Sequence, residues 1–302
     1  MTAALEHKVF VTKQIPQSGR APLPDGSTRM WSPITSTLIM GRHGAVLVDP
    51  PLTTQQADDV GDWIKASGRE LRQIYITHGH GDHWFGAIPL LERFPGVTVL
   101  ATEGTAKLMT AQNDPQFRAD FWDRVFPGQL PAGDVDVTIV DEAGFELDGV
   151  ALVPVEVGHT DTDATTMLHV PETGLLVAGD VVYNGVHLYL TESGGVGGID
   201  EWLAALDTAE TLSPVAVVAG HKAPGADDDP SQIQATRRYL IDARRLLESS
   251  GHPEEFYERM LERHGERLNP ARGTQRSADS RHGPGSYRRE RAAPRREQTR
   301  KQ

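Results

Sequence analysis

Seven consecutive residues constrain this chain more than any other feature: Thr77-His78-Gly79-His80-Gly81-Asp82-His83. They hold three imidazoles and one carboxylate, and they lie between an apolar run typical of a strand and a segment typical of a helix. Imidazoles buried this close together would leave ring nitrogens unpaired when neutral and would repel one another when protonated. A metal ion removes both difficulties, because imidazole nitrogen and carboxylate oxygen are common zinc ligands. The segment therefore predicts a metal site in a loop that follows a strand.

Strand and helix signals alternate along most of the chain. Short runs rich in β-branched residues predict strands over Lys8–Ile15, Thr35–Met40, Ala45–Asp49, Leu71–Ile76, Val97–Ala101, Val137–Val140, Val150–Val157, Thr165–Val170, Leu175–Ala178 and Val215–Ala219. Helical periodicity predicts helices over Thr53–Ala66, Trp84–Arg93, Ile199–Leu212 and Pro230–Ser249. Thr53 and Gln56 form a capping-box pattern at the start of the first helix. Strands mixed with helices, then repeated in a second half, predict two α/β halves packed sheet to sheet.

Three further candidate ligands follow the histidine-rich loop along the chain. His159, Asp180 and His221 each come just past a predicted strand and next to a glycine, where the backbone can turn and approach a metal. This order, His-x-His-x-Asp-His followed by a His, an Asp and a last His, resembles the pattern of the metallo-β-lactamase-fold superfamily. The resemblance covers roughly residues 7–250. It implies an α/β fold of the metallo-β-lactamase type, a four-layer αββα sandwich.

The resemblance also implies a role for each candidate ligand. One metal ion would be held by His78, His80 and His159, the other by Asp82, His83 and His221, and Asp180 would bridge the two. We expect zinc, with two ions per chain, and iron or manganese as alternatives. Two close cations lower the pKa of a bound water, so a hydroxide between them would be the nucleophile. Asp82 would orient this nucleophile and carry its proton to the leaving group.

Two residues near these ligands each have two interpretations. Asp49 ends a predicted strand and matches an acidic residue that supports the ligands in this family, but a turn at a strand end would also explain it. Tyr183, three residues after Asp180, resembles the Asp-x-x-Tyr arrangement of acyl-homoserine lactonases, in which the phenol contacts the substrate carbonyl. We therefore expect a catalytic role for Tyr183, with packing beneath the site as the alternative.

The ligand types narrow the reaction. Position 180 is an aspartate and the chain has no cysteine, whereas β-lactamases of the superfamily generally place cysteine or serine there or lack a bridging carboxylate. A β-lactamase is therefore disfavoured. His80 stands where flavodiiron proteins have glutamate, which disfavours an oxygen-reducing diiron site.

Apolar side chains around the candidate ligands favour a small, largely apolar substrate. Trp31 ends a long loop that could cover the metals, while Trp84 and Phe85 could line the base of a pocket. A stripe at helical spacing could form a wall, although core packing is its simpler interpretation: Phe117, Phe121, Trp122, Val125 and Phe126. Few basic residues that could bind an anionic substrate lie near the ligands: Arg20, Arg29 and Lys222. A substrate role for His187 is left open.

The leading functional prediction is a metal-dependent hydrolase that uses a dizinc-bound hydroxide to cleave a lactone, ester or thioester in a small-molecule substrate. A glyoxalase II-like thioesterase and a mononuclear-iron sulfur dioxygenase on the same scaffold are the alternatives. A noncatalytic binding module is disfavoured, because all seven ligand positions are filled.

Charge is distributed unevenly along the chain. Residues 271–302 hold ten Arg or Lys and three Asp or Glu, a net charge of +7. Because the whole chain carries −12, the first 270 residues carry −19. A body this acidic would repel a phosphate backbone, and we therefore expect no nucleic-acid partner. No apolar stretch is long enough for a membrane helix, and we expect a cytoplasmic protein, with a homodimer left open. We predict a hydrolase domain over residues 1–267 and a basic, disordered tail over 268–302.

Overall fold

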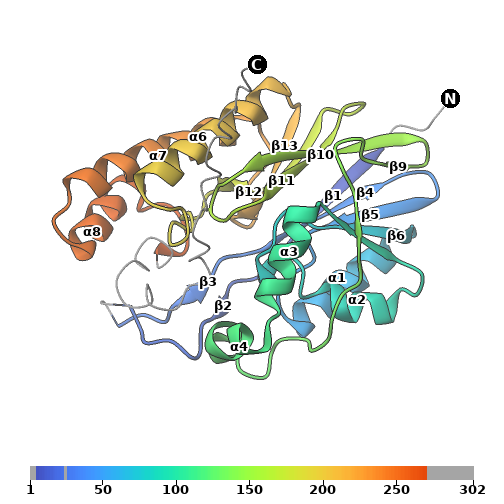
Figure 1. Cartoon of the computed structure of the whole chain (residues 1–302), viewed down its shortest axis with the longest axis horizontal. Helices are drawn as coiled ribbons and strands as arrows, with labels where there is room; N and C mark the ends of the chain where they lie inside the picture. The colour runs from blue at the N-terminus through green and yellow to red at the C-terminus, as the bar shows by residue number, and fades with distance from the viewer. Residues whose placement is uncertain (1–4, 24–25, 271–302) are drawn as a thin grey trace, which may run out of the picture.

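Two β-sheets packed face to face form the centre of the molecule, which the computed structural model describes over residues 5–23 and 26–270 (Figure 1). The first sheet has the order β1-β4-β5-β6-β7-β8 and the second the order β13-β12-β11-β10-β9. The first contains β1 (Glu6–Val11), β4 (Thr35–Met40), β5 (Gly44–Val48), β6 (Glu70–Tyr75), β7 (Thr98–Ala101) and β8 (Val137–Ile139). The second contains β9 (Phe145–Leu147), β10 (Val150–Gly158), β11 (Thr165–Val170), β12 (Leu175–Asn184) and β13 (Ala216–Lys222). A separate hairpin pairs β2 (Ile15–Pro16) with β3 (Met30–Trp31).

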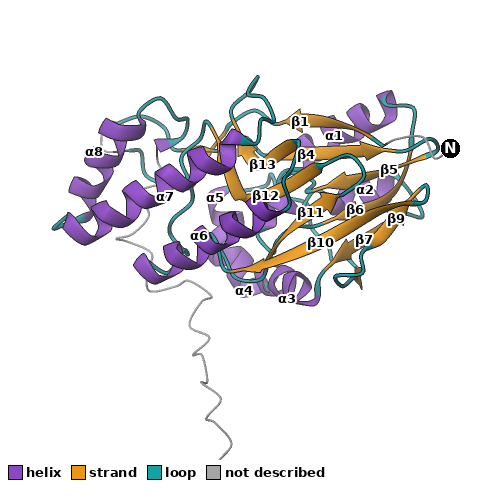
Figure 2. Cartoon of the chain, turned by 90° about the horizontal axis from the view of Figure 1, so that it is seen from above, coloured by secondary structure: helices purple, strands orange, loops and turns teal. Residues whose placement is uncertain are grey.

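Helices cover the outer face of each sheet (Figure 2). Against the first sheet lie α1 (Thr54–Ala66), α2 (Ala87–Arg93) and α3 (Glu103–Gln112), and against the second lie α6 (Val196–Thr211) and α7 (Ser231–Ser249), with α8 (Pro253–His264) packed on α7. Between α3 and β8, an irregular helical segment comprises α4 (Pro115–Phe117), a π-helical turn (Arg118–Trp122) and α5 (Asp123–Val125). Among the described residues, no helix is both long enough and apolar enough to cross a bilayer.

The layering follows from the alternation of side chains along the strands. In β4, Leu38 packs with the helix side of the first sheet and Ile39 packs between the sheets. In β12, Leu176 packs toward the helices of the second sheet and Leu175 between the sheets. Full burial of one such side chain contributes roughly 1.5–3 kcal/mol. Because each sheet has apolar side chains on both faces, each face is stabilised by a layer that covers it. The predicted four-layer αββα sandwich is confirmed.

Most predicted elements are present, with some ends shifted. The capping box at the start of α1 is confirmed by reciprocal hydrogen bonds between Thr53 and Gln56. The helix predicted from Trp84 begins at Ala87, because Gly81–His83 forms a 3-10 turn first. Helices α3 and α8 were not predicted.

The last strands of the second sheet are longer than predicted. β12 continues to Asn184 and β13 to Lys222, so Asp180 and His221 lie within strands and not after them. The register of this parallel pair is irregular around Gly179, whose φ of +52° is favourable for glycine. A Cβ at Gly179 would also come within 2.5 Å of Thr77 Oγ1, so the missing side chain lets the two sheets approach at the site.

The end of the described chain returns to the domain. The Leu268 amide donates to the Gly185 carbonyl at 2.9 Å, and the Asn269 side chain donates to Ser32 Oγ at 2.8 Å. These two residues, which the sequence analysis places in the tail, therefore pack on the folded domain. The rest of the predicted disordered tail, residues 271–302, lies outside the described residues.

Candidate metal centre

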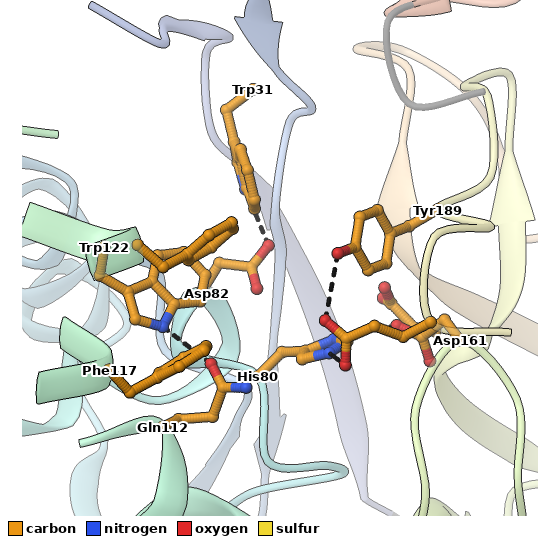
Figure 3. Close-up of a pocket in the computed structure, with 11 residues that line it drawn as sticks. Trp31, His80, Asp82, Gln112, Phe117, Trp122, Asp161 and Tyr189 are labelled. Atoms are coloured by element: carbon orange, nitrogen blue, oxygen red, sulfur yellow. Dashed lines mark hydrogen bonds and ion pairs between the residues drawn. The ribbon is translucent and has the colours of Figure 1, made fainter. Parts of the chain in front are cut away.

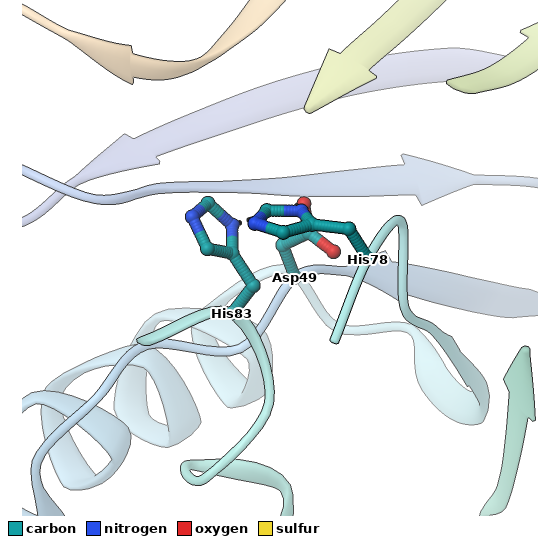
Figure 4. A group of neighbouring side chains, drawn as sticks. All are labelled: Asp49, His78 and His83. Atoms are coloured by element: carbon teal, nitrogen blue, oxygen red, sulfur yellow. Dashed lines mark hydrogen bonds and ion pairs between the residues drawn. The ribbon is translucent and has the colours of Figure 1, made fainter. Parts of the chain in front are cut away.

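The histidine-rich loop is held from behind by Asp49, which directly follows β5. Asp49 Oδ1 accepts a hydrogen bond from the Thr77 amide at 2.9 Å, and Oδ2 accepts from the Thr77 hydroxyl at 2.7 Å. Oδ2 also lies 3.2 Å from His83 Nδ1 (Figure 4). A carboxylate in this position fixes the ring and leaves Nε2 to bind a metal. The supporting role predicted for Asp49 therefore agrees with its contacts.

The first group of ligand atoms comes from Asp82, His83 and His221, whose ligand atoms lie within 4.8 Å of one another. His221 Nε2 is 3.5 Å from Asp82 Oδ2 and 3.3 Å from His83 Nε2. The other nitrogen of His221, Nδ1, donates to the Pro33 carbonyl at 2.7 Å. Both imidazoles therefore present Nε2 to the same point.

Asp180 joins this group from β12. Its Oδ1 lies 3.3 Å from His83 Nε2 and its Oδ2 lies 3.4 Å from His221 Nε2. The phenol of Tyr183 donates a hydrogen bond to Oδ2 from the buried side. Asp180 is therefore a buried carboxylate fixed between His83 and His221.

The second group of ligand atoms contains His78, His80 and Asp161. Asp161 Oδ2 is 3.0 Å from His80 Nδ1 and 3.9 Å from His78 Nε2. Sequence reasoning missed Asp161, because an aspartate in a Thr/Asp-rich turn has no pattern of its own.

His159 is the predicted ligand that the structure does not bring to either group. Its Nδ1 pairs with Asp163 Oδ1 at 2.7 Å, and its Nε2 faces the backbone of α6, where a Cβ on Gly198 would lie 3.0 Å away. Within the described residues, no set of three ligand atoms includes it. The other six predicted ligands converge.

A pocket of about 320 Å³ opens over these groups (Figure 3). Figure 3 shows Trp122 and Phe117 on one side and Tyr189 on the other, with His80 and Asp82 between them. The remaining lining residues are Trp31, Gln112, Phe121, Asp161, Asp180 and Glu192. The π-helical turn at Arg118–Trp122 explains why part of the aromatic stripe faces the pocket, since such turns shift side chains around the helix.

Four of the residues predicted to line the pocket do line it. Trp31 is confirmed as a lining residue, and its indole N–H donates to Asp82 Oδ2 at 2.8 Å. Phe117, Phe121 and Trp122 also line the pocket.

The prediction for the pocket base is wrong. Trp84 and Phe85 are buried in the core beneath the first sheet, and so are Val125 and Phe126 from the stripe. The indole of Trp84 donates to the Gly79 carbonyl at 3.0 Å, which turns it away from the pocket.

Tyr183 and His187 also lie beneath the surface of the pocket. Tyr183 is fully buried and stacks on His221, so its position matches the packing interpretation and not a contact with substrate. His187 Nδ1 lies 3.0 Å from the Tyr239 hydroxyl, and burial lowers its pKa to about 3. Tyr189, which lines the pocket, was not predicted.

Each of the predicted basic residues has a partner, and only Arg20 lies on a residue of the pocket wall, Phe121. Lys222 pairs with Asp228 at 2.5 Å, and Arg29 donates to the Ala21 carbonyl at 2.9 Å. Arg20 lies over the Phe121 ring at 5.3 Å from its centroid. Among the described residues that line the pocket, none is lysine or arginine.

Burial and neighbouring charges shift the pKa values of the clustered histidines in different directions. Burial holds the pKa of His78 well below its ordinary value. Burial also lowers the pKa of His83, but the carboxylates of Asp180, Asp82 and Asp49 together outweigh burial and raise the pKa to about 9. The pKa of His80 is likewise raised against burial, chiefly by Asp161. In the metal-free protein, protons therefore occupy the positions that cations would take.

The donor set fits metal ions. His78 Nε2 and His159 Nε2 are buried and have no hydrogen-bond partner within the described chain, whereas Asp161 Oδ2 and Asp180 Oδ1 face histidine nitrogens. Buried polar atoms without a partner are costly, and a coordinated cation removes that cost. Imidazole and carboxylate together suit zinc, iron or manganese.

The αββα sandwich and the two groups of ligands define a metal-binding hydrolase fold, and comparison with known proteins specifies the family. The metallo-beta-lactamase superfamily model matches residues 29–221. Because this match covers more than half of the chain, the protein belongs to that superfamily and is a hydrolytic enzyme with a His/Asp cluster that can bind metal.

Solved structures share the fold. A metallo-beta-lactamase from Pontibacter korlensis is 21% identical over 80% of this chain and 100% of its own, with a TM-score of 0.53. A metallo-beta-lactamase family protein from Thermus thermophilus is 19% identical over 88% of this chain and 91% of its own, with a TM-score of 0.59. The metallo-beta-lactamase FIM-1 from Pseudomonas aeruginosa, in its mono-zinc form, is 17% identical over 80% and 95%, with a TM-score of 0.52. At these identities the likeness shows the fold alone. No curated protein matches the sequence significantly.

Proposed function

We propose that this protein is a two-metal hydrolase, with zinc as the metal, that cleaves a lactone, ester or thioester bond in a small uncharged substrate. One observation carries the proposal: two groups of buried His and Asp ligand atoms lie at the base of an aromatic pocket, and Asp180 lies against His83 and His221 of one of them. The mono-zinc form of the structurally similar FIM-1 supports the choice of metal.

The ligand residues would divide the work at this site. His78 and His80 would hold one ion together with His159 or Asp161. Asp82, His83 and His221 would hold the other. When bound, such ions lower the pKa of water and polarise a substrate carbonyl. Asp82, whose Oδ2 is fixed by the Trp31 indole, would orient the attacking water and pass its proton to the leaving group.

The pocket would select substrates by charge. Four carboxylates line it, namely Asp82, Asp161, Asp180 and Glu192, and no lysine or arginine does among the described residues. Bound metal ions would offset the charge of the three candidate ligands, so Glu192 is the carboxylate left to repel an anionic substrate, while the faces of Trp122, Phe117 and Phe121 suit an acyl chain. Gln112 completes the recognition surface: its oxygen accepts from the Trp122 indole at 2.7 Å, so its amide nitrogen is the group left to donate.

This charge distribution favours an uncharged substrate over the alternatives. Glutathione thioesters and most β-lactams carry free carboxylates, so a glyoxalase II-like or β-lactamase activity is less compatible with the pocket. A mononuclear-iron sulfur dioxygenase would use one ligand group, whereas the presence of both groups in the described chain favours two metals.

A matched substrate panel tests the proposal. We expect an uncharged acyl lactone or thioester to be hydrolysed with kcat/KM at least about 100-fold above that for a carboxylate-bearing ester of equal size, since a buried unpaired charge costs several kcal/mol. Initial rates would be measured with and without a chelator. Hydrolysis that survives complete metal removal, or a preference for the anionic substrate, would overturn the proposal.

The variant Asp82→Asn separates catalysis from binding alone. We expect it to lower kcat by at least about 100-fold, because a carboxamide cannot accept the proton. The matched control is Asp59→Asn on α1, where an exposed carboxylate contacts Gln55 far from the pocket. Full activity in Asp82→Asn would contradict the proposed role.

A further inference from the structure

We infer that Asn269, near the end of the described chain, is a positioning residue for the metal centre. It acts through the segment Trp31-Ser32-Pro33, which runs between β3 and β4 and contacts two of the candidate ligands. This inference rests on the proposed metal centre but not on the proposed substrate.

The segment Trp31-Ser32-Pro33 contacts one group of ligands from two sides. The Trp31 indole N–H donates to Asp82 Oδ2 at 2.8 Å, as the dashed line in Figure 3 shows. The Pro33 carbonyl accepts from His221 Nδ1 at 2.7 Å, which leaves His221 Nε2 facing Asp82 Oδ2 at 3.5 Å. Residues behind metal ligands orient them in this way. A shift of the segment would therefore displace two ligands of the same group.

Ser32 lies at the middle of this segment and is buried, with 1% of its surface exposed. Asn269 Nδ2 donates to Ser32 Oγ at 2.8 Å, although the two residues are 237 positions apart. The ends of the segment are held by other contacts. The pairing of β2 with β3 holds its start, and the Ile34 amide just after it donates to Thr12 Oγ1 at 2.8 Å. Asn269 therefore fixes the middle of a segment whose ends are already held.

The backbone of the C-terminal segment fixes Asn269 itself. The Leu268 amide donates to the Gly185 carbonyl, and the Leu268 carbonyl accepts from the His187 amide, each at 2.9 Å. Asn269 is 5% exposed and has a φ of +57°, a conformation that asparagine adopts more readily than most residues. The side-chain amide is therefore directed at Ser32 from a backbone that the loop after β12 holds in place.

The loop that holds Leu268 also forms part of the pocket. Tyr189 and Glu192, a few residues further along this loop, both line the pocket, as Trp31 does. The C-terminal segment therefore contacts two parts of the chain that contribute side chains to the same pocket: the loop after β12 and the segment after β3. Its hydrogen bonds set the position of one relative to the other.

A positioning role and a purely structural role differ in their effect on the two ions. A purely structural contact would lower the stability of the whole fold without distinguishing between them. A positioning contact would weaken the ion held by Asp82, His83 and His221, because Trp31 and Pro33 contact ligands of that group. Selective weakening of one ion is therefore the result that identifies positioning.

Four variants of the full-length protein test the inference. Asn269→Gly removes the amide and still permits a positive φ, Ser32→Ala removes the hydroxyl, and the double variant removes both. The control is His264→Ala on α8, which removes a half-buried contact with Asp242 at the same end of the chain.

Metal binding supplies the readout. Each protein would be stripped of metal and reloaded with Zn²⁺, and the affinity of each of the two ions would be measured by competition with a chromophoric chelator. The visible absorption spectrum of the Co²⁺-loaded protein would report the ligand geometry independently of activity.

We expect Asn269→Gly and Ser32→Ala each to weaken one ion by about 10-fold, to leave the other within about 2-fold of the parent and to alter the Co²⁺ spectrum. The double variant should match the single variants within about 2-fold, because all three remove the same contact. His264→Ala should keep both ions within about 2-fold of the parent, even if it lowers the free energy of unfolding.

Unchanged affinity for both ions in Asn269→Gly would overturn the inference. So would equal weakening of both ions, additive losses in the double variant, or the same selective loss in His264→Ala. If Asn269→Gly does not fold, Ser32→Ala decides by the same criteria. Failure of the parent protein to bind two ions would reject the proposed metal centre and the inference with it, so the two failures are distinguishable.

Discussion

Single residues behind the ligands determine how well the metal centre is formed. Asp49 fixes His83, and the Pro33 carbonyl fixes His221, so that each ring presents Nε2 inward. Tyr183 does the same for a carboxylate, because its phenol donates to Asp180 from beneath. A catalytic residue must reach the substrate, whereas Tyr183 is fully buried. We therefore regard Tyr183 as a positioning residue.

The variant Tyr183→Phe should lower metal affinity by roughly 10–100-fold, with a loss of activity that added metal restores in part. The reason is that Asp180 would lose a hydrogen bond but keep its place. The control is Tyr239→Phe, which removes a buried hydroxyl next to His187, away from the metal centre. A lower kcat with unchanged metal affinity would indicate a substrate contact instead.

The metal-free protein should lose stability as the pH rises from about 6.5 to about 9. The pKa of His83 is raised to about 9 in the folded state, so its protonated form stabilises the fold below the ordinary pKa near 6.5. That contribution, about 3 kcal/mol for such a change in pKa, disappears as the pH passes 9. Thermal unfolding of chelator-treated protein at several pH values measures it. A midpoint that rises over this range would contradict the assignment.

Sequence reasoning identified most of the residues that the structure brings together as candidate ligands, but not all of them. The spacing of His78 to His83 is itself a metal pattern, so those residues could be predicted. Asp161 could not, because its position depends on a register shift in β10 that leaves no compositional trace.

Among the secondary-structure elements, the site depends on the close pairing of the parallel strands β12 and β13. Gly220 in β13 lies against the backbone of Gly179 and Asp180 in β12, and a Cβ there would overlap both residues. The pair can bring Asp180 beside His221 because position 220 has no side chain. The sequence analysis did not predict this arrangement, because it ended both strands before Asp180 and His221, whereas both strands continue past these residues.

Gly220→Ala should therefore lower the free energy of unfolding by about 1–3 kcal/mol and weaken metal binding, because the added methyl must displace Asp180 or its backbone. Gly197→Ala is the matched control: Gly197 is in α6, and its Cβ would meet nothing within 4 Å. Denaturant unfolding and metal titration would be measured for both. A Gly220→Ala protein with unchanged metal affinity would show that this strand pair tolerates a side chain at position 220.

At the scale of the whole molecule, the chain closes on itself near residue 269. Besides the contacts of Leu268 and Asn269, Arg267 donates to the Val186 carbonyl at 3.0 Å and lies over the Tyr239 ring at 5.1 Å. These contacts join the C-terminal segment to the loop after β12, which leads into the pocket. The four-layer fold was predictable from the order and length of the apolar runs, whereas this closure depends on single long-range contacts that no periodicity encodes.

Two truncations test this closure. A chain ending at Pro270 keeps all these contacts and should unfold at nearly the same temperature as the full chain. A chain ending at Gly265 loses them and should be less stable by roughly 2–4 kcal/mol, since each lost hydrogen bond contributes about 1 kcal/mol. Equal stability of the two truncated chains in thermal unfolding would contradict the structural role of residues 266–270.

The central claim is that this chain builds a two-metal centre, and the metal content of the purified protein tests it most directly. Elemental analysis of protein prepared without added metal or chelator would measure ions per chain. We expect close to two divalent ions per chain, chiefly zinc, with hydrolysis lost on their removal and recovered on their return. A stable content of one iron per chain, or no bound metal in protein that still hydrolyses its substrate, would contradict it.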